Sequence, residues 1–207
     1  MDWTYPSLMR PKPDRCPLLG IPPELRDLIF EYALKSEKTL VSFRLDDYQR
    51  DSFAQAVQPA LTKVSQQIRR ESIPLWYSCN DFVLHSEAAK ANDARKWLLC
   101  NETQLPKLRQ ISFWMRYVTL ENRVKSANGA ICITLKRVNL SSDWTVDDEW
   151  RWITVVRKPE ALERDAKFLI EHLRQLLQED WPDKLSVAGI HGLLTDLREG
   201  YVKEKAA

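Results

Sequence analysis

Residues 18–34 read LLGIPPELRDLIFEYAL, a hydrophobic lead-in followed by a proline pair and one amphipathic stretch. Pro22 and Pro23 suit a helix start, because the first N–H groups of a helix have no intrahelical acceptor. Glu24 and Asp27 place negative charge in the first turns, where the helix dipole favours it. The stretch therefore predicts a helix that begins at Pro23 and ends at about Leu34.

One face of this expected helix is apolar. Its residues recur at three- and four-residue spacing: Leu25, Leu28, Ile29, Tyr32 and Ala33. Phe30 falls off this face, and Leu34 does so in part. Two interpretations of Phe30 stay open: it packs under the following loop, or it makes a second contact with another segment or with a partner.

A second informative segment, residues 61–84, reads LTKVSQQIRRESIPLWYSCNDFVL. Its apolar spacing predicts a helix from about Pro59 to Tyr77, in which Pro74 marks a bend or a separate last turn. NDFVLH at 80–85 then predicts a short strand.

The two segments share an ordered residue pattern. It runs Leu18-Leu19-x-Ile21-Pro22-x-Glu24-Leu25-Arg26-x-x-Ile29-Phe30, followed by Leu61-x-x-Val64-x-x-Gln67-Ile68-Arg69-x-Glu71-x-x-x-Leu75-Trp76-Tyr77-x-x-Asn80-x-Phe82. This pattern resembles the F-box-like family of filamentous fungi. The first segment alone is weakly specific, whereas the ordered pair is fairly specific and covers under half of the chain.

The resemblance implies a docking function. F-box proteins use their helical head to bind a Skp-type adaptor of a cullin ubiquitin ligase, and the rest of the chain recruits a target. The docking candidates that it implies here are Leu19, Ile21, Pro22, Leu25, Ile29 and Phe30. In a compact F-box the two halves are close, whereas residues 35–58 separate them in this chain. The first helix therefore has a second interpretation, as the N-terminal layer of a self-contained fold.

The remainder of the chain predicts a sheet and further helices. Three β-rich segments predict an antiparallel meander: LRQISFWMRYVTL at 108–120, AICITLKRVNL at 130–140 and WRWITVVRK at 150–158. A helix is expected at 86–100 before them. A long amphipathic helix at 159–180 follows and is expected to lie across the sheet. Residues 185–201 predict one or two short helices, broken near Gly189 and Gly192.

These segments predict an α+β fold in which a helical head precedes a mostly antiparallel sheet, covered by the long C-terminal amphipathic helix. We expect an extended, proline-rich arm at 1–17 and an F-box-like head at 18–84. The head contains the insert 35–58, in which a short strand is expected at 38–45. Residues 85–207 are expected to form one continuous domain with the head.

Composition narrows the function classes. The net charge is +2, and the five glycines form neither a G-x-G-x-x-G nor a P-loop pattern, so no nucleotide cofactor is expected. The four scattered cysteines form no C-x-x-C pair, and no histidine spacing indicates a metal. Because no long apolar run or signal peptide is present, we expect no membrane span and an intracellular location, cytoplasmic or nuclear. A non-enzymatic interaction protein is the resulting expectation.

An alternative function is nucleic-acid or other recognition without a ubiquitin-ligase link. Trp114 and Arg116 are expected on a half-polar, exposed strand face, and Lys136 and Arg137 on a basic strand edge. The competing interpretation is that the helix at 86–100 covers Trp114.

Overall fold

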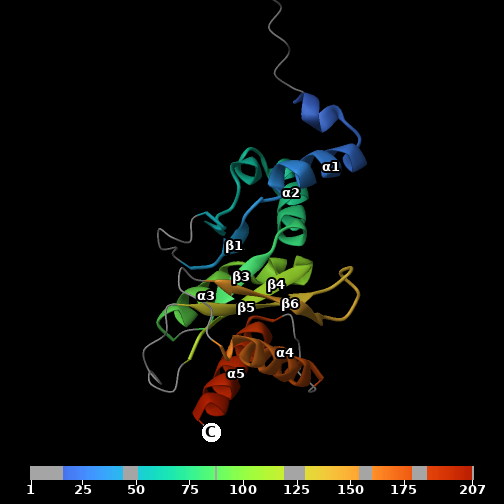
Figure 1. Ribbon diagram of the computed structural model, residues 1–207. Helices are drawn as coiled ribbons and strands as arrows, with labels where there is room; N and C mark the ends of the chain where they lie inside the picture. Colours follow the sequence, from blue (N-terminus) through green and yellow to red (C-terminus); the bar gives the residue numbers. More distant parts are fainter. Residues whose placement is uncertain are drawn as a thin grey trace, which may run out of the picture.

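The computed structural model (Figure 1) describes residues 16–43, 51–86, 88–118, 129–153, 160–178 and 186–206. The longer helices are α1 (Pro23–Leu34), α2 (Gln66–Cys79), α3 (Ala88–Cys100), α4 (Leu162–Gln178) and α5 (Val187–Ala206), and the short 3-10 helices are η1 (Pro17–Gly20), η3 (Ala60–Lys63) and η4 (Glu102–Lys107). The strands are β1 (Thr39–Val41), β2 (Phe53–Gln55), β3 (Phe82–His85), β4 (Gln110–Arg116), β5 (Ala130–Lys136) and β6 (Thr145–Ile153). The expected arm at 1–17 lies outside the described residues except for its last two.

The strands form one six-stranded mixed sheet in the order β2-β1-β3-β4-β5-β6. The β4–β5 and β5–β6 pairs are antiparallel and form the longest ladders, so most paired residues have antiparallel partners, as the meander predicts. The β1–β2, β1–β3 and β3–β4 pairs are parallel, which the sequence did not indicate. β3 and β4 are joined through α3, because parallel strands need a long crossover connection.

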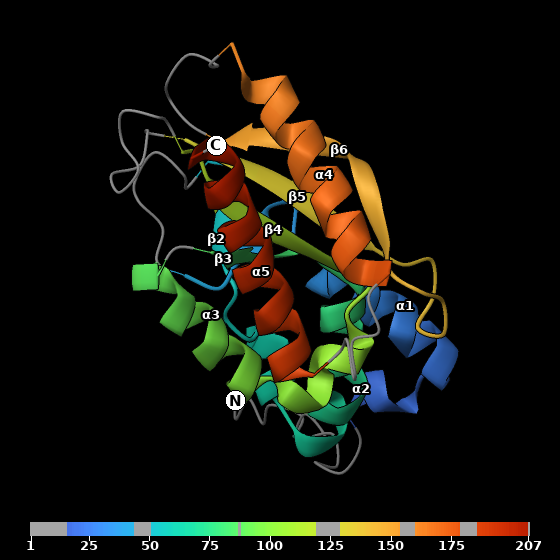
Figure 2. The ribbon, with the colours of Figure 1, turned by 90° about the horizontal axis from the view of Figure 1, so that it is seen from below.

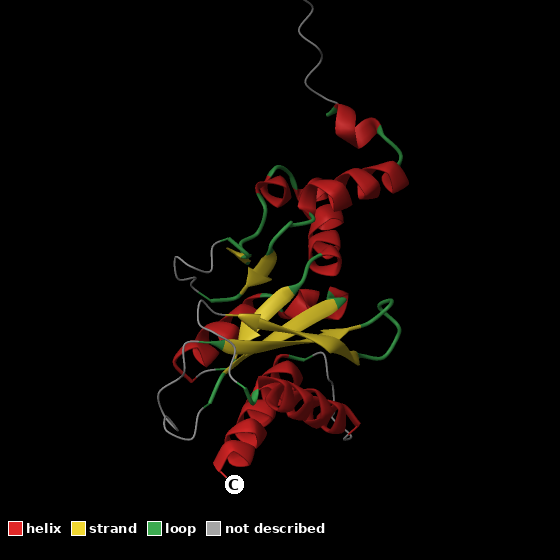
Figure 3. Ribbon diagram, in the orientation of Figure 1, coloured by secondary structure: helices red, strands yellow, loops and turns green. Residues whose placement is uncertain are grey.

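Helices cover one face of the sheet (Figures 2 and 3). α4 and α5 lie beneath it in Figure 1, whereas α1 and α2 lie near the start of β3, where Trp76 packs against Phe82, and their buried residues belong to the same main core. The apolar stripe of α4 is turned inward: Leu177 is half-buried, and the following residues are buried: Leu162, Ala166, Leu169, Leu173 and Leu176. Trp150 and Trp152 of β6 are half-buried and pack against the same core. The expectation of a long amphipathic helix across the sheet is confirmed.

The start of β6 differs from the expected one. β6 begins at Thr145 rather than at residue 150, because Thr145 and Val146 continue the ladder beyond a register shift in β5. Residues 154–158 of that expected strand lie outside the described part of the chain.

The expected break near Gly189 and Gly192 is wrong, because α5 is continuous. Gly189 lies in its first turn, where its N–H donates to Ser186 Oγ over 2.9 Å. Buried apolar residues along α5 offset the helix cost of glycine, which is about 1 kcal/mol per residue: Ile190, Leu193, Leu194, Leu197 and Tyr201.

A second, smaller core lies on the opposite face of the sheet. Its buried members are Val41, Phe43, Phe53, Val83, Trp114, Ala130 and Cys132. The insert 35–58 therefore supplies β1, β2 and a cover for this face. Within the described part of the strand expected at 38–45, residues 39–41 form β1; residues 44–50 lie outside the described ranges.

Candidate functional site

The two halves of the sequence pattern meet between α1 and α2. Arg26 Nε and Nη2 each donate to the Glu71 carboxylate over 2.8 Å, in a two-pronged ion pair. Arg26 Nη1 also donates to the carbonyl of Ile21 over 2.6 Å. The hydrogen bond from Arg26 holds the pKa of Glu71 below its usual value. This pair fixes the start of α1 against the middle of α2.

Asn80 joins the ends of the same two helices. Its Nδ2 donates to the carbonyls of Leu34 over 3.0 Å and Trp76 over 2.8 Å, and its Oδ1 accepts the Ser36 N–H over 2.7 Å. Asn80 is buried, so these bonds satisfy main-chain groups that water cannot reach. α1 is thus held near both of its ends.

The predicted apolar face of α1 points outward. Phe30, Leu34 and Arg26 are buried on the opposite side, with Phe30 wholly inaccessible and part of the main core. The large apolar side chains of the outward face have these exposed fractions: Leu25 51%, Leu28 62%, Ile29 43% and Tyr32 91%. We call this set the α1 face.

The six docking candidates differ in their exposure to solvent. Leu25, Ile29 and Pro22 are exposed, whereas Leu19 and Ile21 are half-buried. Phe30 is wrong as a docking residue, because it fills the core beneath α1. Leu28 and Tyr32 belong to the α1 face but were not among the docking candidates, although the three- and four-residue spacing includes both.

The surface expected around Trp114 does not form. Trp114 is only 4% exposed, and its ring packs edge-on against Phe43 and Phe53, with ring centroids 5.3 and 5.4 Å away. The physical reason is the insert 35–58, which covers this strand face in place of the helix at 86–100. Arg116 is half-buried.

The two residues of the expected basic strand edge, Lys136 and Arg137, also differ in their exposure. Lys136 is exposed and pairs with Asp147 over 2.8 Å. Arg137 is buried, contrary to its expected exposure, because its guanidinium turns into the chain. Its Nε, Nη1 and Nη2 donate to the carbonyls of Leu108, Leu140 and Pro106 over 2.8, 2.9 and 2.5 Å.

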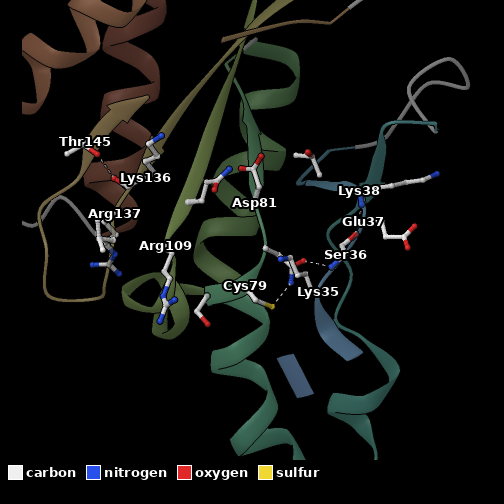
Figure 4. A pocket seen from close by; sticks show the side chains of 15 residues that line it. Lys35, Ser36, Glu37, Lys38, Cys79, Asp81, Arg109, Lys136, Arg137 and Thr145 are labelled. Atoms are coloured by element: carbon white, nitrogen blue, oxygen red, sulfur yellow. Dashed lines mark hydrogen bonds between the residues drawn. The ribbon is translucent and has the colours of Figure 1, made fainter. Parts of the chain in front are cut away.

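A cleft of about 520 Å³ lies beside this edge (Figure 4). We call it the basic cleft. It is bounded by the loop after α1, the end of α2, the start of β4 and the end of β5, and its cationic residues are Lys35, Lys38, Arg109, Lys136 and Arg137. In Figure 4, Arg109, Lys136 and Arg137 form one side and Lys35 and Lys38 the other.

The acidic residue Asp81 lies between the two sides of the cleft. Burial raises its pKa, while hydrogen bonds from Ser112 Oγ at 2.9 Å and Arg151 Nη2 at 3.0 Å act in the opposite direction.

Arg151 also lies against Cys132 Sγ, yet burial raises the pKa of that thiol to about 11. Cys132 is therefore a protonated core thiol near neutral pH rather than a nucleophile.

Within the described ranges, no group of three or more histidine, cysteine, aspartate or glutamate residues is arranged to hold a metal ion. None of the helices described here is both long and apolar enough to cross a bilayer.

Comparison of the chain with protein-family models, curated proteins and solved structures found no match.

Proposed function

We propose that this chain is a non-enzymatic protein-interaction module that docks a Skp-type adaptor of a cullin ubiquitin ligase through the α1 face. The resemblance of the two-segment pattern to F-box-like proteins suggests the adaptor. The observation that supports docking is the outward orientation of Leu25, Leu28, Ile29 and Tyr32.

The spacing of these residues suits a helix that lies in a groove. They occupy positions i, i+3, i+4 and i+7 of one helix, the anchor pattern of helix-in-groove recognition. Single exposed apolar side chains are common on protein surfaces, but several on one helix face make a continuous patch. Burying such a patch on a partner contributes about 25 cal/mol per Å² of apolar surface.

The α1 face is also supported from behind. The Arg26–Glu71 pair, the Asn80 hydrogen bonds and the buried Phe30 hold the helix in one position. A helix that is already ordered loses little conformational entropy when a partner binds. The fixed α1 face is therefore suited to docking without prior folding.

Capture of a purified Skp-type adaptor by the full chain tests the proposal. Leu25→Asp and Ile29→Asp each place a charge in the centre of the α1 face, so we expect capture to weaken by about tenfold or more. Leu28→Asp and Tyr32→Asp are expected to act in the same direction. Leu99→Asp is the matched control, because Leu99 of α3 is 52% exposed and lies outside the α1 face.

Failure of the intact protein to bind the adaptor would overturn the adaptor proposal. Equal loss in Leu99→Asp would assign the effect to general destabilisation. Circular dichroism of every variant is measured alongside, so that loss of binding is compared at equal folded fraction.

A further inference from the structure

We infer that the basic cleft is a second interaction site, separate from the α1 face, and that it binds an acidic segment of a protein partner. Five cationic side chains and the carboxylates of Glu37 and Asp81 line it, a surplus of three positive charges. The whole chain has a net charge of only +2. Asp147 pairs with Lys136 over 2.8 Å, which reduces the surplus at the cleft to two positive charges, and a positive potential there favours an anion.

The buried Arg137 distinguishes the basic cleft from a group of solvent-exposed lysines. The residue is 6% exposed, and all three of its side-chain hydrogen bonds go to neutral carbonyls. Among the described residues, no carboxylate forms an ion pair with it. Burial lowers its pKa, and the positive charge of Arg109 lowers it further. The three carbonyls and the Trp144 ring, whose centroid lies 4.9 Å from Arg137 Cζ, offset part of the cost of burying this cation, and an anion in the cleft would offset more of it.

Arg109 and Lys35 are the cations placed to contact such an anion directly. Both are exposed, and within the described part of the chain neither forms an ion pair. They lie on opposite sides of the cleft in Figure 4. The fork of Arg109 suits a carboxylate, and Lys35 suits a second negative group across the cleft.

The lining favours a peptide over nucleic acid. No aromatic side chain is among the described residues that line the cleft, so bases have no ring on which to stack. Asp81 and Glu37 would repel a continuous phosphate backbone, whereas a peptide of mixed composition tolerates both. Val138, which is 87% exposed, offers an apolar contact on the same lining.

Fluorescence polarisation of a labelled oligoglutamate peptide with the full chain tests this site. We expect saturable binding that weakens as salt is raised, because charge pairs at a partly open cleft are screened. Arg109→Glu is expected to lower the affinity by about tenfold or more, and Lys35→Glu to lower it less. Arg95→Glu is the matched control, since Arg95 of α3 is exposed and lies outside the cleft lining; its affinity should stay within about twofold.

Three outcomes would overturn the inference. They are absence of saturable peptide binding, equal loss in Arg95→Glu, and tighter binding of a single-stranded oligonucleotide that is abolished by Arg109→Glu. The last outcome would assign the cleft to nucleic acid. Leu25→Asp is expected to leave peptide binding unchanged, so the outcome here is independent of adaptor docking through the α1 face.

Discussion

Arg26 and Glu71, 45 positions apart in the chain, form two parallel hydrogen bonds of 2.8 Å that join α1 to α2. Both residues belong to the pattern that resembles F-box-like proteins, one to each half. The Arg26 side chain is 8% exposed and that of Glu71 is 24% exposed. The pair therefore helps to hold the side of α1 that carries Arg26, Phe30 and Leu34 inward and leaves the α1 face toward solvent.

Glu71→Gln is expected to change how stability depends on pH. The hydrogen bond from Arg26 lowers the pKa of Glu71 in the folded state from its usual value of 4.5. Its contribution is thus fully present above pH 4.5 and is lost as the pH falls through the lowered folded-state value. Urea unfolding should show wild type more stable than Glu71→Gln at neutral pH, with the difference shrinking below pH 4.5.

The control for this measurement is Glu199→Gln, an exposed carboxylate in a surface pair with Lys203. Its difference from wild type should be small at every pH. A difference for Glu71→Gln that stayed constant through acid pH would show that the Arg26 pair does not stabilise the fold electrostatically.

Asn80→Ala is expected to destabilise the protein strongly. The change removes the acceptor of the Ser36 N–H, which is partly buried, and the donor to the Leu34 and Trp76 carbonyls, which are buried. Each buried polar group left without a partner costs roughly 1–3 kcal/mol. The free energy of unfolding in urea measures the loss, and Asn139→Ala in the exposed loop after β5 is the control. Similar values for both variants would contradict the role given to Asn80.

The α1 face shows what hydrophobic periodicity predicts and what it leaves open. The spacing of Leu25, Ile29 and Tyr32 identified an apolar face correctly. Periodicity alone does not say whether the chain itself covers that face. The side that is buried contains Arg26, a residue usually found at the surface, and its burial depends on Glu71 in a distant segment.

In the sheet, too, local spacing predicts which side chains share a face but not which segment covers that face. Strand alternation places Phe113 and Met115 in the main core and Trp114 in the smaller one, because strand geometry is local. The environment of Trp114 depended instead on the insert 35–58, whose Phe43 and Phe53 come from elsewhere in the chain. Burial of Arg137 likewise depends on carbonyls of Pro106 and Leu108, which no spacing rule places beside it.

Gly129→Ala is expected to destabilise the start of β5 by about 1–3 kcal/mol, because overpacking forces neighbouring side chains to shift. A Cβ at this position would overlap the Trp152 indole, which packs edge-on against Tyr117 with ring centroids 5.6 Å apart. Trp152→Leu shortens the obstructing side chain, so adding Gly129→Ala to it should cost less. Thermal unfolding of the four proteins in this double-mutant cycle measures the coupling, and additive losses would rule out the contact.

Phe30→Ala and Leu28→Ala compare the two sides of α1 directly. Phe30 is wholly buried, so its truncation removes core contacts and leaves a cavity, with an expected loss of about 3–5 kcal/mol. Leu28 is 62% exposed, so its truncation should change the free energy of unfolding by no more than about 0.5 kcal/mol. Urea unfolding of the isolated chain supplies both values. A large loss for Leu28→Ala would mean that the chain itself covers the α1 face, and docking through that face would then be impossible.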